Sequence, residues 1–118
     1  MAHARQFLDE NGFVNPRRLA ESLHTTVKEV AELSGLPVEA VSKRQRLHSK
    51  RAQKRLRDMV MVLNRVEPWC GSLFQAYAWY RSEPIPSLGD ATAEDLVKAG
   101  KADLVLRHLG RIAQGGYA

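Results

Sequence analysis

The residues whose types and spacing indicate chemistry are the lysines and arginines between positions 43 and 57. This window holds eight of the 18 basic residues in the 118-residue chain and contains no aspartate or glutamate. The other residues include ten basic and 13 acidic side chains, a formal charge of −3, although the whole chain is at +5. Such a local excess of cations suits the neutralisation of nucleic-acid phosphates. A solvated helix face is the alternative, but such faces usually mix both signs of charge.

No pattern of a catalytic or metal site is present in the sequence. The chain lacks GxSxG, GxGxxG and the phosphate-binding GxxxxGK[ST], and its four histidines show neither HxxxH nor HExxH spacing. Cys70 is the only cysteine, which excludes an internal disulfide and a cysteine-rich metal site. We therefore expect a protein that is not an enzyme and that holds no cofactor or metal. His108 is interpreted as a surface or rim residue.

Length and hydropathy set broad limits on the class of protein. The chain has the size of one compact domain or of two small helical modules. It has no run of about 18 apolar residues, and its first residues lack the apolar stretch of a signal peptide. We expect a cytoplasmic protein.

The segment before the basic window has the spacing of a helix-turn-helix from Glu29 to Ser42. Ala31 allows two helices to approach closely, Gly35 suits a left-handed turn, and Val41 packs the second helix onto the first. A plain helical hairpin carries similar residues and remains an alternative. Because the basic window follows directly, the expected DNA contacts are Ser42, Lys43, Arg44, Gln45, Arg46, Lys50 and Arg51.

Starts of helices are predicted on both sides of this motif. Asn15 and Pro16 have the form of a helix start, and Thr26 with Glu29 has the spacing of a capping box. A long helix is predicted from Ser49 to about Val66, ended by Pro68. Its apolar stripe consists of Ala52, Leu56, Met59, Val60, Leu63 and Val66.

Met61 and Val62 lie beside that stripe and widen the apolar surface of the long helix. They indicate either a buried central helix or a dimer contact. Helix-turn-helix repressors commonly place two reading heads on one operator, so we expect a homodimer.

The carboxyl-terminal segment, from Trp69 to Ala118, predicts three further helices. Leu73, Ala76, Tyr77 and Tyr80 predict one that Pro84 and Pro86 stop. A short helix capped by Thr92 ends at Gly100, and a last helix is released by two glycines. The inner face of the last helix is predicted to be Ala102, Val105, Leu106, Leu109, Ile112 and Ala113, and both tryptophans, Trp69 and Trp79, are expected in the core.

This order of residues resembles the toxin-binding domain of the Xre/MbcA/ParS antitoxins, which neutralise toxins with an RES domain. The family usually has a basic residue and a proline shortly before its Asp-Leu pair, where this chain has Thr92 and Ala93. The resemblance covers roughly the last 50 residues closely and the remainder in general plan. It is carried by Trp79, Leu88, Gly89, Glu94, Asp95, Leu96, Val97, Gly100, Val105, Leu109, Ile112 and the terminal Gly-Gly-Tyr-Ala.

The resemblance implies an all-α protein with an Xre-like helix-turn-helix module over residues 1–66 and a toxin-binding domain over residues 67–118. It implies an antitoxin that inhibits an RES-domain toxin, which degrades NAD by hydrolysis or phosphorolysis, and that binds operator DNA to repress its own operon. Without the resemblance, the last residues would be interpreted as a frayed end. The implied toxin contacts are Arg107, Arg111, Gln114, Gly115, Gly116, Tyr117 and Ala118.

The alternative function is a helix-turn-helix transcriptional regulator without a toxin partner, in which the carboxyl-terminal helices serve dimerisation or a small-molecule response. The antitoxin hypothesis differs because it expects an RES-domain protein to co-purify with this chain. A membrane-surface protein is disfavoured, since the basic segment lacks bulky aromatic residues.

Overall fold

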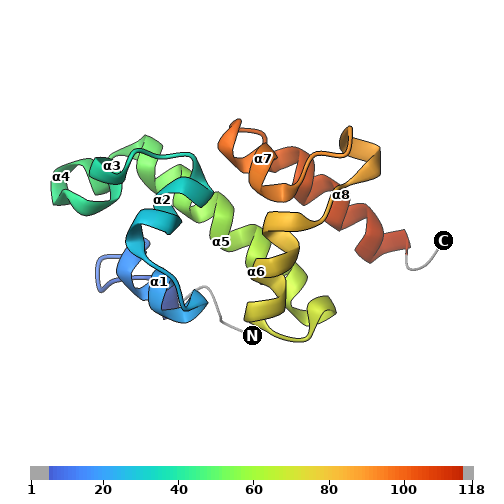
Figure 1. Cartoon of the computed structure of the whole chain (residues 1–118), viewed down its shortest axis with the longest axis horizontal. Helices are drawn as coiled ribbons and strands as arrows, with labels where there is room; N and C mark the ends of the chain where they lie inside the picture. The colour runs from blue at the N-terminus through green and yellow to red at the C-terminus, as the bar shows by residue number, and fades with distance from the viewer. Residues whose placement is uncertain (1–5, 116–118) are drawn as a thin grey trace.

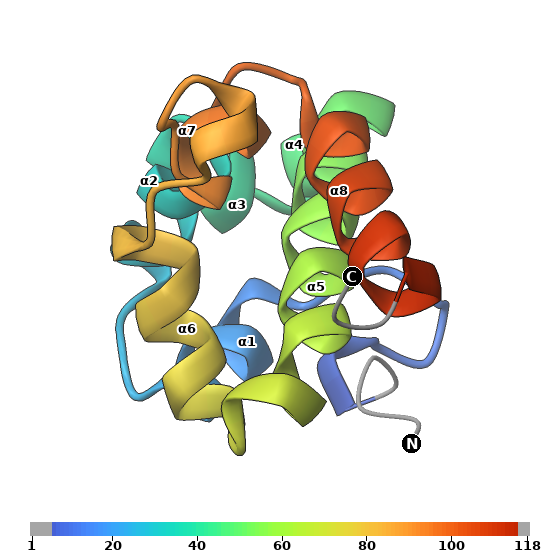
Figure 2. The same cartoon turned by 90° about the vertical axis from the view of Figure 1, so that its right-hand side faces the viewer.

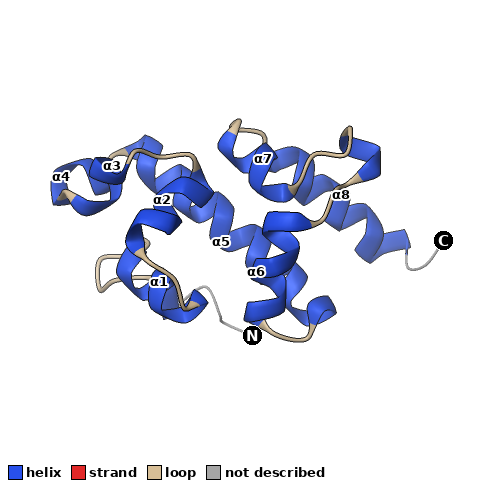
Figure 3. Ribbon diagram, viewed as in Figure 1, coloured by secondary structure: helices blue, strands red, loops and turns tan. Residues whose placement is uncertain are grey.

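The computed structural model describes residues 6–115, and these fold into α-helices without a named β-strand (Figure 3). This confirms the predicted all-α class. The helices are α1 (Pro16–Leu23), α2 (Val27–Ser34), α3 (Val38–Ser42), α4 (Arg44–Leu47), α5 (Lys50–Cys70), α6 (Leu73–Ser82), α7 (Ala93–Lys98) and α8 (Ala102–Gly115), with a short 3-10 helix, η2 (Pro86–Leu88), between α6 and α7.

Helix α5 is the centre of the fold. All six residues of its predicted stripe are buried, and Val62 is buried beside them. Helices α2 and α4 pack on α5 from the amino-terminal part, and α6, α7 and α8 pack on it from the carboxyl-terminal part. Figure 1 shows α5 crossing the middle of the molecule between these two groups. Met61, by contrast, is 47% exposed and lies outside the core.

The end of α5 differs from the prediction. The helix continues through Pro68 to Cys70 and stops at Gly71, whose φ is 98°. A proline cannot donate the backbone hydrogen bond of its own position, but in the last turn this costs a single bond. The turn therefore survives and carries Trp69 beyond the core.

Local chemistry sets the starts of the first two helices as expected. The Asn15 side chain accepts hydrogen bonds from the backbone at the start of α1, and Thr26 Oγ1 accepts one from Glu29 N at 3.1 Å. The carboxylate of Glu29 does not complete the predicted capping box. It accepts hydrogen bonds from the hydroxyls of Thr25, at 3.1 Å, and Tyr77, at 3.3 Å. Because Tyr77 lies on α6, Glu29 links distant parts of the chain.

Gly35 ends α2 for two physical reasons. Its φ of 72° is in the left-handed region, as its predicted turn requires. A Cβ at this position would also lie 2.9 Å from Cα of Lys98, at the end of α7. Only glycine allows α2 and α7 to approach so closely.

Helix α7 begins at the predicted threonine. Asp95 N donates to Thr92 Oγ1 and Thr92 N donates to Asp95 Oδ2, each at 3.1 Å, which is a reciprocal capping box. An isolated bridge between Ile85 and Ala91 closes the loop that contains η2. The proline break before α7 is therefore an ordered connection.

The segment before α1 is tied to the core. Phe7 and Val14 are each 1% exposed. Gln53 of α5, itself buried, accepts a hydrogen bond from Val14 N at 2.8 Å and donates one to Leu47 O at 3.0 Å. One buried amide thus fixes both this segment and the end of α4.

The amino-terminal and carboxyl-terminal helices share one hydrophobic core. The cluster of buried apolar residues runs from Phe7 through α5 to Leu109. Besides their common packing on α5, α1 contacts α6 and α2 contacts α7. Figure 2 shows α1 and α6 on one side of α5, with α8 running alongside it.

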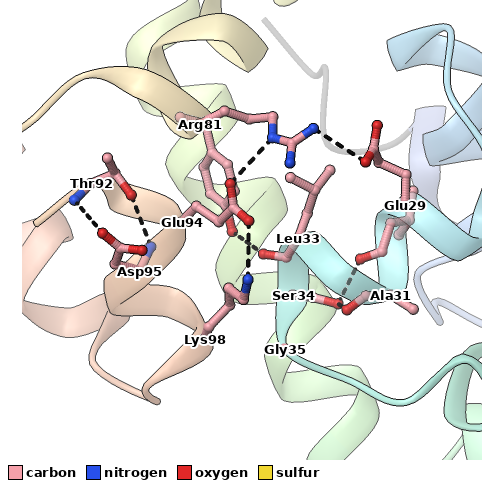
Figure 4. Close-up of polar contacts among 12 residues, drawn as sticks. Glu29, Ala31, Leu33, Ser34, Gly35, Arg81, Thr92, Glu94, Asp95 and Lys98 are labelled. Carbon is pink, nitrogen blue, oxygen red and sulfur yellow. Dashed lines mark hydrogen bonds and ion pairs between the residues drawn. The ribbon is translucent and has the colours of Figure 1, made fainter.

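A group of polar contacts joins α2 to α5, α6 and α7. We name it the polar seam, and its side chains are those of Glu29, Arg55, Tyr80, Arg81, Glu94 and Lys98. Arg81 Nη1 lies 3.2 Å from Glu29 Oε1, and Arg81 Nε lies 3.3 Å from Glu94 Oε1 (Figure 4). Lys98 Nζ lies 3.2 Å from the other oxygen of Glu94. Partial burial lowers the pKa of Arg81, but the carboxylates of Glu94 and Glu29 raise it, and the net result is a raised pKa. Arg81 is therefore a permanent cation between two acids.

The polar seam also satisfies the carbonyl groups at the ends of two helices. The Tyr80 hydroxyl, fully buried, donates to Leu33 O at 2.8 Å. Arg55 Nη1 donates to Ser34 O at 3.3 Å and to Lys98 O at 3.0 Å. The last carbonyls of a helix have no partner within the helix, so these side chains serve as caps for α2 and α7.

Candidate functional site

The residues predicted to contact DNA lie together at one end of the long axis of the molecule. Ser42 ends α3, Lys43 joins α3 to α4, and the next three residues are on α4. All are exposed, together with Lys50 and Arg51 at the start of α5. Figure 1 shows α3 and α4 at one end of the molecule and the end of α8 at the other. We name this surface the basic end: Ser42, Lys43, Arg44, Gln45, Arg46, Lys50 and Arg51.

After Gly35 the chain forms two short helices, α3 and α4. Lys43 has extended dihedrals, φ −99° and ψ 122°, which separate α3 from α4. Ser42 Oγ donates back to Val38 O at 2.7 Å, an arrangement that competes with the helical backbone pattern. The basic side chains are thus presented from a bend, with Val41 alone of α3 fully in the core.

The cations of the basic end have no role in the fold that the contacts reveal. Within residues 6–115, none of its five lysines and arginines forms an ion pair. Lys50 and Arg51 lie in the first turn of α5, where the helix dipole disfavours positive charge, and no acid balances them there. An anion bound at this surface would supply the missing counter-charge and would offset the unfavourable interaction of Lys50 and Arg51 with the helix dipole.

Two other cations of the basic window are used by the fold. Lys54 Nζ lies 2.8 Å from Asp58 Oδ2, and Arg55 caps α2 and α7 in the polar seam. These two cations cannot be separated from their neighbours by sequence alone, because all carry the same charge and lie in one short segment.

The predicted toxin-contact residues that the structure describes lie on one exposed face of α8. Arg107, Arg111, Gln114 and Gly115 are exposed, and they recur at about one-turn spacing. Arg107 Nη2 pairs with Asp103 Oδ2 at 2.9 Å, and both side chains are well exposed. Ala102, Val105 and Leu109 form the buried face, whereas Ile112 is 42% exposed and Ala113 is also exposed, unlike their predicted places in the core.

The last helix ends later than predicted. Gly115 belongs to α8, so the helix is not released at this residue. A single glycine lowers helix propensity but does not stop a helix whose preceding turns are packed. Gly116, Tyr117 and Ala118, which complete the predicted contact tip, lie outside the described residues.

An apolar groove of about 330 Å³ lies between the end of α5 and α8. The groove is not predicted from the sequence, because both tryptophans are expected in the core. Trp69 is instead 53% exposed, since α5 continues past Pro68. Trp79 is half-buried beside the core. The groove is lined by Val66, Trp69, Cys70, Trp79, Glu83, Pro84, Ile85, Pro86, His108, Leu109 and Ile112.

The side chains that line this groove include three polar ones, Cys70, Glu83 and His108. Burial raises the pKa of the Cys70 thiol, which disfavours the thiolate needed for nucleophilic chemistry. His108 Nδ1 lies 3.3 Å from Ser87 Oγ at the rim, the location predicted for this histidine. In the part of the chain that is described, no three histidine, cysteine, aspartate or glutamate residues are grouped so as to hold a metal ion.

No helix within residues 6–115 combines the length and apolarity needed to cross a bilayer. Comparison with known proteins yields no matching family model, no similar curated protein and no similar solved structure. The surfaces of the chain therefore have to be interpreted from their own chemistry.

Proposed function

We propose that this protein is an antitoxin with two binding surfaces: the basic end for operator DNA, and the α8 face with the residues after it for an RES-domain toxin. The observation that carries the DNA part is the group of exposed cations that no acid of the described chain neutralises. Binding to phosphate would supply the missing counter-charge, and its strength would depend steeply on salt.

The geometry around Gly35 supports a helix-turn-helix as the DNA-binding element. Helices α2 and α3 are joined by a left-handed glycine and a buried leucine, and Val41 returns α3 to the core. In this proposal the bend at Lys43 presents Arg44 and Gln45 toward base edges, where guanidinium and amide groups can make two-pronged contacts with guanine and adenine. The remaining cations contact the phosphate backbone.

The toxin-binding part of the proposal rests on the resemblance of the last 50 or so residues and on the exposed α8 face. Because that face is distant from the basic end along the 45 Å axis, the two partners need not compete (Figure 1). The terminal Gly-Gly-Tyr-Ala would enter the catalytic cleft of the toxin and exclude NAD. A homodimer, with Met61 among its exposed apolar contacts, would place two basic ends on one operator.

Co-expression with an RES-domain protein encoded beside this chain tests the proposal directly. We expect the full chain to co-purify with that protein and to preserve cellular NAD, whereas deletion of residues 115–118 restores NAD loss and leaves DNA binding unchanged. Full protection by the truncated chain would remove the tip from the mechanism and leave Arg107 and Arg111 as candidates. DNA binding without any toxin association would instead favour a simple transcriptional regulator.

A further inference from the structure

A basic depression lies beside the basic end, between α5 and the turn that joins α7 to α8. Its volume is about 330 Å³, and its lining residues are Lys50, Arg51, Lys54, Arg55, Asp58 and Gly100. Four of these six residues are cations, and the one carboxylate, Asp58, is already paired with Lys54 at 2.8 Å. We name this depression the basic hollow.

The basic hollow is continuous with the basic end, because Lys50 and Arg51 belong to both. One wall of the hollow is formed by α5, and the other comes from the carboxyl-terminal half of the chain, at Gly100. Figure 2 shows α8 running alongside α5. The shared lining of the hollow places the α7–α8 turn, at Gly100, against the first turns of α5. A nucleic acid held at the basic end would extend over residues of the carboxyl-terminal part.

Arg55 is oriented so that it can serve both the fold and a ligand. Its hydrogen bonds to Ser34 O, Gly35 O and Lys98 O are all donated by Nη1. Its other terminal nitrogen, Nη2, lies 3.6 Å from the point that a Cβ atom would occupy if residue 100 were not glycine. Nη2 therefore faces the turn that forms one wall of the hollow. Three fixed carbonyl contacts hold this guanidinium in place, and little freedom would be lost when it binds an anion.

We propose that the basic hollow binds a backbone phosphate of the nucleic acid, so that the Gly100 turn forms part of the nucleic-acid interface. This inference rests on the proposed DNA-binding function. It adds Lys54, Arg55 and Gly100 to the contacts expected from sequence, and it makes the carboxyl-terminal half of the chain a contributor to DNA affinity.

A matched pair of variants at Gly100 tests the inference. The φ of this residue is 76°, a region that asparagine and aspartate enter more readily than other side chains, and its Cβ position meets no close contact. Gly100→Asp and Gly100→Asn therefore carry nearly the same strain and bulk but differ in charge. The added carboxylate would pair with Arg55 in place of a phosphate.

The probe is a random-sequence duplex of about 20 base pairs, because phosphate contacts do not depend on sequence. By fluorescence anisotropy at about 0.1 M salt, we expect Gly100→Asp to bind roughly fivefold more weakly than Gly100→Asn, the effect of one unit charge near a phosphate in a solvated site. Circular dichroism would establish that both variants fold.

A second variant keeps the test independent of the glycine. Lys54→Gln, whose amide can still donate to Asp58, should reduce the slope of log affinity against log salt by about 0.9, the value of one phosphate contact. Arg65→Ala, exposed on the same face of α5 three turns later, should leave the slope unchanged. If the two Gly100 variants bind equally and Lys54→Gln keeps the wild-type slope, while the wild-type chain still binds the duplex, then the hollow does not bind a phosphate and only this inference is overturned. A wild-type chain that binds no duplex would overturn both proposals.

Discussion

Arginine side chains have opposite roles in the polar seam and at the basic end. In the seam, Arg81 lies between two carboxylates and Arg55 donates to three carbonyl groups. At the basic end, Arg44, Arg46 and Arg51 are exposed, with no ion pair among the described residues. Positive charge in the first region holds helices together, and in the second it is available to a partner.

The contrast teaches that position along the chain does not reveal which role a cation has. Arg51 and Arg55 are one turn apart on the same helix, within one acid-free window. Only the packing of α2 and α7 against α5 supplies carbonyl groups to one and leaves the other in solvent. Variants that treat such neighbours differently can therefore test the interpretation.

The largest effect is expected at the basic end, from Lys43→Ala, Arg44→Ala and Arg46→Ala combined. Loss of three phosphate contacts should weaken duplex binding by roughly 10²-fold to 10³-fold at 0.1 M salt and reduce the salt slope by about 2.7. Anisotropy titrations at several salt concentrations measure both quantities. The free energy of unfolding should stay within about 0.5 kcal/mol of wild type, because these side chains are exposed. An unchanged slope would remove this surface from the DNA interface.

Arg55→Met should have the largest effect on stability. The substitution keeps an apolar stem but leaves carbonyls at the ends of α2 and α7 without their charged donor. A loss of about 3 kcal/mol in the free energy of unfolding is expected, as for charge-assisted hydrogen bonds to partly buried groups. Urea denaturation measures it. Arg51→Met, one turn earlier and exposed, is the matched control and should cost less than about 0.5 kcal/mol. Similar losses for both would contradict the division between seam and basic end.

Local features of the fold could be predicted from the sequence because their chemistry is local. The stripe of α5, the caps at Asn15, Thr26 and Thr92, and the turn at Gly35 depend on residues within a few positions of each other. Apolar spacing and capping side chains report such features directly. The predicted helices consequently match most of the observed ones.

Features that depend on distant segments could not be predicted in this way. The sequence indicates that Gly35 permits a left-handed turn, but not that Lys98 of α7 lies against it. Glu29 has the spacing of a capping box, yet residues of α6 take its carboxylate. The sequence predicts Trp69 in the core, but α5 continues through Pro68, so Trp69 lines a groove instead. In each case the deciding contact joins residues that are far apart in the chain or extends a helix beyond its usual stop.

A smaller effect, with a characteristic pH dependence, is expected for Tyr80→Phe. The substitution removes the hydroxyl that donates to Leu33 O, and should cost about 1 kcal/mol at neutral pH. Thermal or urea unfolding of the two proteins at pH 7 to 8 measures this difference.

At high pH the same pair of proteins distinguishes a buried tyrosine from an exposed one. Burial, then the charges of Glu94 and Asp58, raise the pKa of Tyr80 well above its ordinary value of 10.0, although Arg55 acts in the opposite direction. The unfolded chain therefore releases the Tyr80 proton from about pH 10 upward, while the folded chain retains it. The stability that this hydroxyl contributes is complete below pH 10 and is lost as pH rises toward the folded pKa. The stability advantage of wild type over Tyr80→Phe should accordingly shrink above pH 10, and an advantage that stays constant to pH 11 would show that the hydroxyl is open to solvent rather than sealed in the polar seam.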